Sequence, residues 1–414
     1  MIGMNNIHDT FRVTNKAVMN PWINLEIHQD IEYTGFLEIG PNRDQVEVSI
    51  DSSEADLWVI SKDAECVHPE SEEVISEDAG ESCHIIGTFD VAESESFKIE
   101  HDIPDLISFT HNFQASGVWG TDEIVVGDVV IENIPFGVAN QTTNHIGILG
   151  LGKPSNSRHA KTNLLAELAN RGIIHRRAYS IYLGPLEGKG SVLFGGIDRQ
   201  KIKRGTLKKI PMVTNSSHIA VNVDRIEISS KKAVNMVSQE STKYNLETAR
   251  SYSIFPENVI DGIAAALGGE FNHNLQAYSS NCSLADTSTM RLQFGNTTFD
   301  IPTKALISAR NQNSCYLSVD SGEQFSFGVD ILRYLYTVVD FDEMKVSFAA
   351  VKFTDEENIE AMPVFNSTII QQNDEPIYHA SKSSMAMSIN SSLYSLWKWI
   401  LIGSTICWTG GQYL

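Results

Sequence analysis

Two stretches of the sequence place a carboxylic acid directly before a hydroxyl residue and look like copies of one device. The first contains Asp51 and Ser52 within SIDSSEADLWV, and the second contains Glu247 and Thr248 within YNLETARSYSIFP. Two carboxylates held about 3 Å apart cannot both ionise, so they share one proton. One of them can then activate a water molecule while the other protonates a carbonyl oxygen. If the fold brings these two acids together, the pair would perform general acid–base chemistry.

The elements that must position these acids are predicted to be strands. Several runs carry alternating or continuous apolar residues, rich in β-branched and aromatic types, between turns of Gly, Asn and Asp. These runs are 45–50, 123–134, 178–183, 191–194 and 336–340. Two helices are expected, at 161–171 before Gly172 and at 256–267, which has Pro in its first turn. The predicted fold class is all-β with a few short helices.

The composition excludes some classes of protein. The 414 residues include 31 basic and 52 acidic side chains, a formal net charge of −21, and this length fits two to three domains or one bilobal unit. A nucleic-acid partner is not expected, because phosphate binding needs a basic surface and basic residues gather only in short runs such as 201–204. The sequence has no HExxH, paired CxxC or phosphate loop, so no metal and no cofactor are expected. A monomer is expected.

Four of the five cysteines form two pairs that are close in sequence. Cys66 with Cys83, and Cys282 with Cys315, would each close a short loop. Buried free thiols would fit the same spacing, so both interpretations stay open at this point. The first pair lies in the acidic stretch 63–96, which is expected to be a solvated, disulfide-closed surface loop.

Six Asn-X-Ser/Thr sequons are candidate glycan acceptors, which are useful only in a secretory compartment. Their asparagines are Asn140, Asn215, Asn281, Asn296, Asn366 and Asn390. A single sequon can arise by chance, but six sequons together with two local cysteine pairs favour an oxidising compartment. An extracellular or cell-surface location is therefore expected.

The two ends of the chain give different indications about secretion. Residues 1–13 contain no apolar core, so no signal peptide is predicted there. Residues 392–414 are largely apolar and follow the small-residue segment 380–384, an arrangement that approximates a GPI-attachment signal. An amphipathic or frayed helix is the alternative. A membrane span is less favoured, because the apolar run is shorter than the roughly 20 residues that a bilayer requires.

The segment 49–59 resembles the DTGSSDLWV signature of pepsin-like aspartic proteases, with Asp51 as the catalytic acid. Residues 33–40 (YTGFLEIG) precede it as the opening strand of that family does. Residues 146–152 (IGILGLG) are similar to the family's apolar-apolar-glycine element, which passes behind the catalytic turn. The resemblance implies that these three segments form one catalytic unit.

A second unit follows in the same order. Residues 244–256 resemble the second catalytic segment of the family, usually DSGTT or DTGTT, and 327–336 resemble its second apolar-apolar-glycine element. The resemblance covers roughly residues 30–360. It implies a bilobal fold with Asp51 on one β lobe and Glu247 on the other, and a peptide or protein substrate.

The cysteine pairs, the acidic insertion and the Ser/Asn-rich C-terminal region are similar to those of yapsins, the cell-surface fungal members of this family. The resemblance implies the following organisation. It comprises an N-terminal extension (1–30), an N-terminal lobe with the flap (31–200), a C-terminal lobe (201–365), a stalk (366–391) and an apolar tail (392–414). A GPI-anchored protein of the plasma membrane or cell wall is expected.

Both catalytic turns depart from the family pattern. Glu247 replaces an aspartate, so its carboxyl lies one carbon–carbon bond farther from the backbone, and a misplacement of about 1 Å can cost on the order of a hundredfold in rate. Ser53 and Ala249 replace the glycines that let backbone amides approach each carboxylate. These changes predict impaired catalysis.

Two further changes affect charge. Glu54 and Arg250 occupy the hydroxyl positions that normally bond the outer carboxylate oxygens, and the family's pseudo-twofold axis relates them. A direct Glu54–Arg250 ion pair across the cleft floor is therefore predicted, with a solvent-facing Arg250 as the alternative. An arginine this close favours the ionised form of both catalytic acids, which disrupts proton sharing.

The flap and its neighbours complete the predicted cleft. The segment 107–117 resembles the family's flap hairpin, but Phe109 replaces the flap tyrosine and His111 replaces the acid that follows it. Trp58 keeps its place without its usual hydroxyl partner. Ser52 and Thr248 complete the set of expected cleft residues.

Three functions are compatible with these features. The first is a yapsin-like homologue with impaired catalysis that retains a peptide-binding cleft. The second is an active endopeptidase that uses an Asp51/Glu247 pair at acid pH, cleaving near basic residues. The third is a non-enzymatic cell-wall scaffold.

Overall fold

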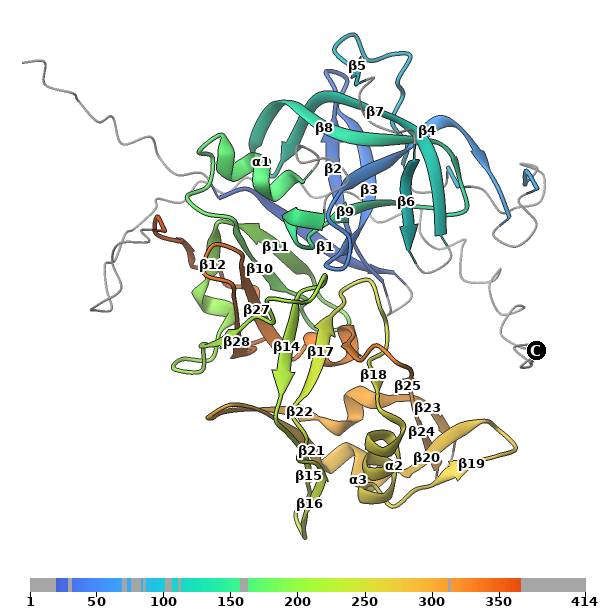
Figure 1. Cartoon of the computed structure of the whole chain (residues 1–414), viewed down its shortest axis with the longest axis vertical. Coiled ribbons are helices and arrows are strands. Elements are labelled where there is room, and N and C mark those ends of the chain that lie inside the picture. Colours follow the sequence, from blue (N-terminus) through green and yellow to red (C-terminus); the bar gives the residue numbers. More distant parts are fainter. Residues whose placement is uncertain are drawn as a thin grey trace, which may run out of the picture. The chain divides into compact units, whose positions relative to one another are not determined.

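The computed structural model covers the whole chain (Figure 1), and the structure describes a defined part of it. The described ranges are 20–28, 32–68, 73–75, 83–84, 87–100, 106–110, 113–156, 163–311 and 314–365. They all belong to one compact unit that extends to Ile369. The predicted stalk and apolar tail lie outside the described residues. Among the helices of the described ranges, none is both long and apolar enough to cross a membrane.

A 14-stranded sheet holds most strands of the first half of the chain (Figure 1). These strands are β1 (Trp22–His28), β2 (Glu32–Ile39), β3 (Asp44–Asp51), β4 (Leu57–Cys66), β5 (Lys98–Ile99), β6 (Leu106–Thr110), β7 (Phe113–Val126), β8 (Val129–Thr142), β9 (Gly147–Gly150), β10 (Ala178–Tyr182) and β11 (Gly190–Phe194). Three later strands complete it: β13 (Lys208–Pro211), β27 (Leu335–Asp340) and β28 (Lys345–Ala350). The order is β13-β28-β27-β10-β11-β1-β2-β3-β9-β4-β8-β7-β5, with β6 paired to β7. The sheet therefore contains strands from both sides of the predicted lobe boundary at residue 200.

Smaller sheets hold the other strands. A five-stranded sheet has the order β14 (Ala220–Val223), β17 (Thr242–Leu246), β26 (Ser326–Phe327), β18 (Ile254–Phe255) and β25 (Asp320–Ser321). One four-stranded sheet consists of β16 (Val234–Ser238), β15 (Arg225–Ser229), β21 (Thr289–Phe294) and β22 (Thr297–Pro302). The other consists of β19 (Phe271–Asn272), β20 (Ala277–Asn281), β24 (Ser314–Leu317) and β23 (Ile307–Asn311). A two-stranded sheet pairs β12 (Gly196–Asp198) with β29 (Ile359–Ala361).

The helices within the described ranges are short. The α-helices are α1 (Leu164–Asn170), α2 (Glu257–Ala266), α3 (Cys282–Thr287) and α4 (Val329–Leu332), and the 3-10 helices are η2 (Pro154–Asn156), η3 (Arg199–Lys201) and η4 (Thr303–Leu306). The predicted helix at 161–171 begins only after Asn163, whose side chain caps α1 by accepting a hydrogen bond from the Ala166 N–H. The predicted helix at 256–267 corresponds to α2. The fold class, mostly β with few short helices, is confirmed.

The strands follow from their residue patterns. In β15 and β21 buried residues alternate with partly exposed ones, as expected for strands with one face on the core, whereas β10 is buried throughout. Behind the second acidic turn, Tyr244 stacks on Phe327 with ring centroids 4.7 Å apart, and Phe255 packs against both rings. Burying each such aromatic side chain stabilises the fold by roughly 1.5–3 kcal/mol.

Three expectations differ from the structure. The run 123–134 is not one strand, because β7 ends at Val126 and a two-residue turn leads into β8, with Gly127 at φ +60°. The predicted extension 1–30 is not wholly outside the fold, because Trp22–His28 forms β1 between β2 and β11. The loop 63–96 is not entirely at the surface, because Phe89 is fully buried and its ring contacts those of Phe97 and Phe136.

Candidate active site

The first acidic turn follows β3 directly. Asp51 is buried, and its Oδ1 accepts hydrogen bonds from the Ser53 N–H (2.7 Å), the Ser53 hydroxyl (2.6 Å) and the Glu54 N–H (3.4 Å). The Cβ of Ser53 was expected to keep the backbone amide away from the carboxylate. That expectation is wrong, because the amide approaches as it would in glycine and the side chain adds a second donor.

Strand β9 passes behind this turn, parallel to β3, in the position that the resemblance implies. Gly150 pairs with Asp51 in this register. A Cβ at Gly150 would lie 2.5 Å from backbone atoms of Ala55 and Asp56, and one at Gly147 would lie 2.5 Å from the Trp58 carbonyl oxygen. Only glycine permits this close approach, so β9 fixes the turn from behind.

The second acidic turn is built in the same way. Glu247 follows β17, is 7% exposed, and donates its N–H to the Phe327 carbonyl oxygen (3.0 Å). Strand β26 runs parallel to β17 and leads to Gly328, where a Cβ would lie 2.7 Å from the Arg250 carbonyl oxygen. A glycine therefore supports each turn from behind.

The Glu247 carboxylate is held by an arginine of its own turn. Arg250 Nε donates to Glu247 Oε2 at 2.7 Å, and the arginine side chain is 25% exposed. Arg250, which was predicted to pair with Glu54 across the cleft floor, thus binds Glu247 in its own turn. The reason is geometric. The two residues are three positions apart in one tight turn, which brings their side chains together. Ala249, between them in sequence, is exposed.

Reciprocal hydrogen bonds join the two turns. The Ser52 N–H donates to Thr248 Oγ1 (3.0 Å), and the Thr248 N–H donates to Ser52 Oγ (3.0 Å). Each hydroxyl in turn donates to a carbonyl oxygen of the other segment, Ser52 to Leu246 (2.7 Å) and Thr248 to Ile50 (2.6 Å). Asp51 and Glu247 are the residues directly before these hydroxyls. The sequence identifies both hydroxyl residues but not their mutual bonding.

Buried polar groups lie behind both turns. The Tyr179 hydroxyl donates to the Leu151 carbonyl oxygen at 2.9 Å, and burial, with a smaller effect of the Asp51 charge, raises the pKa of Tyr179. Behind the second turn, Asp330 accepts hydrogen bonds from the N–H (3.0 Å) and hydroxyl (2.6 Å) of Ser253. Burial raises the pKa of Asp330 to about 6. Sequence reasoning missed this pair, since no motif distinguishes Asp330 from a surface acid.

The structure describes the predicted flap only through its backbone. Strands β6 and β7 form an antiparallel hairpin in which Phe109 pairs with Gln114. The Phe109 side chain and the whole of His111 lie outside the described residues. Trp58 is buried, and its Nε1 has no hydrogen-bond partner within the described part of the chain, as expected from the missing hydroxyl.

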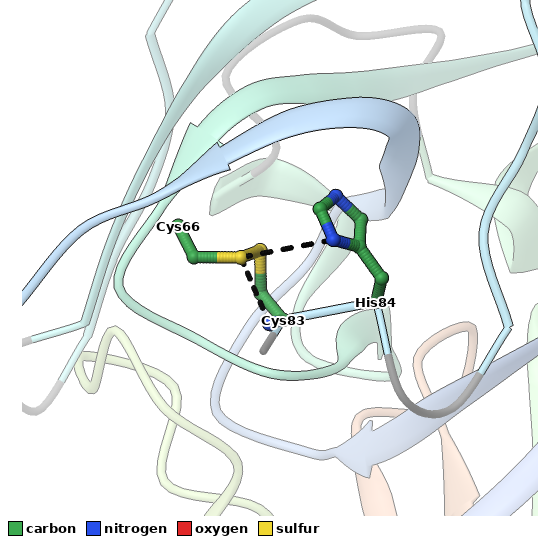
Figure 2. A group of neighbouring side chains, drawn as sticks. All are labelled: Cys66, Cys83 and His84. Carbon is green, nitrogen blue, oxygen red and sulfur yellow. Dashed lines mark hydrogen bonds between the residues drawn. A yellow bond between two sulfur atoms is a disulfide. The ribbon is translucent and has the colours of Figure 1, made fainter. Parts of the chain in front are cut away.

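The four paired cysteines form two disulfides, Cys66–Cys83 and Cys282–Cys315. Figure 2 shows the His84 ring beside the first, with Nδ1 4.0 Å from Cys66 Sγ, while the Cys83 N–H also approaches this sulfur (2.8 Å). The ligand atoms of these three residues lie within 4.8 Å of one another. Since the two sulfurs are bonded to each other, they are not thiolate ligands for a metal ion in this state.

Four of the six sequon asparagines lie in the described ranges, and all four are exposed: Asn140, Asn215, Asn281 and Asn296. Asn281 also caps α3, its Oδ1 accepting a hydrogen bond from the Leu284 N–H. That bond uses the oxygen and not the nitrogen to which a glycan is attached. Asn366 and Asn390 lie outside the described residues.

Comparison with known proteins indicates the same protein family as the two acidic turns do. A profile of the family described as eukaryotic aspartyl protease matches residues 32–351. Secreted aspartic protease 10 of Candida albicans is 31% identical over 383 residues, covering 88% of this chain and 80% of that protein. Secreted aspartic protease 9 of the same species is 32% identical over 297 residues (67% and 54%), and secreted aspartic protease 8 is 28% identical over 340 residues (81% and 80%). The chain belongs to the eukaryotic aspartyl protease family.

Proposed function

We propose that this protein is a yapsin-like, cell-surface aspartic protease homologue that retains a peptide-binding cleft but has impaired peptidase activity. The observation that carries the proposal is the 2.7 Å contact of Arg250 Nε with Glu247 Oε2. A guanidinium remains charged at all working pH values and stabilises the carboxylate anion beside it. The catalytic cycle of a carboxyl pair requires one of the two groups to carry a proton, and this contact opposes that state.

The longer side chain of Glu247 acts in the same direction. Its carboxylate turns back to a residue of its own turn, whereas catalysis needs it to face Asp51 across a shared water molecule. Catalytic groups must be placed within fractions of an ångström, and a misplacement of about 1 Å can lower the rate about a hundredfold. This arrangement is therefore expected to lower the rate of peptide hydrolysis by about a hundredfold or more.

Peptide binding is expected to survive, because the framework of the cleft is intact in both turns. The Ser52–Thr248 bonds hold the turns together, and the amide donors around Asp51 are in place. The family acts on peptides and proteins, and the same substrate class is proposed here. The proposed cleft residues are Ser52, Ser53, Glu54, Trp58, Phe109, Thr248, Ala249 and Arg250.

The proposed location is the outer face of the cell. Two disulfides and exposed sequon asparagines are typical of proteins of the secretory route, and the relatives named above are described as secreted. We assign residues 31–200 and 201–365 to two lobes, 366–391 to a stalk and 392–414 to a GPI-attachment signal. Mass spectrometry of the C-terminal peptide released from cells tests the anchor.

The catalytic proposal is tested with purified protein and mixed peptides between pH 3 and 6. The wild type is expected to cleave only slightly faster than Asp51→Asn, while both bind an immobilised statine peptide. The triple variant Glu247→Asp, Ala249→Gly, Arg250→Thr is expected to cleave peptides at least about tenfold faster than the wild type. This factor corresponds to the free energy of one hydrogen-bonded charge contact. Arg199→Thr, which removes an exposed ion pair with Glu360 far along the chain, is the control.

One observation favours a second candidate, an active endopeptidase using Asp51 and Glu247. The three donors to Asp51 are those that an ionised catalytic acid needs. Statine-sensitive cleavage by the wild type that Asp51→Asn lacks, at a rate that the triple variant does not exceed, would establish this activity and refute impairment. If the wild type fails to bind the statine peptide as well, a scaffold role without a working cleft replaces both candidates.

A further inference from the structure

We infer that the protein has a second binding site, which takes a sugar bearing a phosphate or sulfate ester. The site is a cavity of about 450 Å³, a size typical of small-molecule pockets. Its walls are the turn 203–206, the start of β13, the tip of the β21–β22 hairpin, and residues of β27 and β28. None of the residues proposed above for the catalytic cleft lines it.

One wall is a turn fixed by hydrogen bonds. The Lys203 N–H donates to the Ala350 carbonyl oxygen (2.9 Å), and the Ala350 N–H donates to Thr206 Oγ1 (3.1 Å). The Thr206 hydroxyl then donates back to the Lys203 carbonyl oxygen (2.6 Å). This closed set of bonds holds the lysine backbone in place beside the cavity, so the wall is formed before any ligand arrives.

The opposite wall is the β21–β22 hairpin. Its two-residue turn has Gly295 at φ +57°, and the Gly295 N–H donates to the Asp224 carboxylate (2.6 Å). The hairpin packs on the large sheet through Phe299, whose ring lies edge-on to that of Phe348 with centroids 5.9 Å apart. Lys208 is the cross-strand partner of Phe348, so its side chain lies on this same face of the sheet.

The charge of the cavity is opposite to that of the protein as a whole. The chain carries a net charge of −21, yet Lys203 and Lys208 both line the cavity and are exposed. In the part of the chain that the structure describes, neither lysine side chain forms an ion pair. The acid in the wall, Asp300, is bound by Arg291 through two bonds of 2.7 and 3.0 Å. Two cations are therefore available for an anionic ligand, which they would attract locally.

The remaining groups match a sugar ring. Thr297 and Thr298 bring hydroxyls that can donate to or accept from sugar hydroxyls. The partly exposed Tyr334 supplies aromatic surface, against which the apolar face of a pyranose packs, and its phenol adds a further polar group. Lysine side chains, threonine hydroxyls and one accessible aromatic ring favour a ligand that joins an anionic ester to a sugar.

The rim of the cavity contains Asn296, one of the candidate glycan acceptors. A glycan at this position would lie at the entrance and compete with an added sugar. The experiment therefore uses the full chain made in a bacterial periplasm, where disulfides form and this glycan is not added.

Binding is measured by titration calorimetry with glucose 6-phosphate, glucose 6-sulfate, glucose and inorganic phosphate. At least one ester is expected to saturate the protein and to bind at least about tenfold more tightly than glucose or phosphate alone, because each of these lacks half of the contacts. The double variant Lys203→Gln/Lys208→Gln is expected to weaken ester binding by at least about tenfold. Preference between the two esters identifies the anion that the site takes.

The matched control is Lys231→Gln/Lys232→Gln, two exposed lysines in the β15–β16 turn that give the same change in net charge. It is expected to change ester binding by less than about twofold. Equal weakening by both double variants would mean that only net charge matters, and the proposal would fail. Equal binding of glucose and its esters, or no saturable binding, would also overturn it. Circular dichroism of both variants checks that the fold is retained.

Discussion

Ser253 binds the buried carboxylate of Asp330 through both its backbone N–H and its hydroxyl. The same hydroxyl accepts a hydrogen bond from the Gly328 N–H (3.0 Å), and the Arg250 carbonyl oxygen accepts one from the Val329 N–H (2.9 Å). The acid thus supports the second acidic turn from behind. Its protonation state is expected to affect the whole protein.

The pH dependence of stability follows from this acid. Burial raises the pKa of Asp330 from its ordinary value of 3.8 to about 6, so the folded state binds the proton more tightly than the unfolded state. The resulting stabilisation is complete below about pH 4 and is lost as the pH rises through 6, a change of roughly 3 kcal/mol. Urea unfolding from pH 3.5 to 7.5 should therefore show a smaller loss of stability with rising pH for Asp330→Asn than for the wild type. Parallel curves would contradict this prediction.

The hydroxyl of Thr248 is expected to be essential for joining the two turns. Thr248→Val keeps the shape of the side chain but leaves the buried Ser52 N–H and the Ile50 carbonyl without their partner. An unpaired buried group costs about 1–3 kcal/mol, so the free energy of unfolding should fall by about 2 kcal/mol or more. Thr248→Ser retains the hydroxyl and is the control. Similar urea midpoints for the two variants would show that the bonds contribute little.

The two disulfides are expected to stabilise the protein unequally. The Cys66–Cys83 bond spans 17 residues and Cys282–Cys315 spans 33. Loop-closure entropy predicts that the disulfide of the shorter loop stabilises the folded state by about 3 kcal/mol. A loop twice as long adds about 0.6 kcal/mol to this stabilisation. Double serine variants at each pair, unfolded in urea, measure both values. A larger loss at the shorter loop would show that effects in the native state outweigh chain entropy.

The stacked pair Tyr244–Phe327 should dominate the packing behind the second turn. Phe327 is fully buried, so Phe327→Ala is expected to cost about 3–5 kcal/mol. The control is Phe36→Ala, at a position that is 44% exposed, which should cost less than about 1 kcal/mol. Thermal and urea unfolding measure the loss of stability in each variant. A small cost at Phe327 would mean that the neighbouring rings close the cavity.

The sequence predicts the strands and the first turn well because both depend on local patterns. Apolar alternation identifies β3, and a nearly continuous apolar run identifies β10. The glycines of the segment 146–152 identify a strand that must pass close behind the turn. The two-residue turn at Gly127 was missed because apolar residues continue on both sides of it. A run of valines predicts a strand, but only the glycine and aspartate within it indicate the reversal.

The charged groups of the site were harder to predict from sequence. The pseudo-symmetry of the family pairs Arg250 with Glu54, but the shorter route along one turn brings Arg250 to Glu247. Likewise, Ser53 adds a side chain where glycine is usual, yet the backbone keeps its path and the hydroxyl becomes a donor. Both outcomes depend on the local path of the backbone, which residue types alone do not specify.

The bonds between Ser52 and Thr248 join residues that are 196 positions apart in the chain. At a synthesis rate of about 5–20 residues per second, the first turn leaves the ribosome roughly 10–40 s before its partner exists. During that time the polar groups of Ser52 lack their partners at Leu246 and Thr248 and must bond to water or to other groups. The bonds between the two acidic turns can therefore form only late in the synthesis of each molecule.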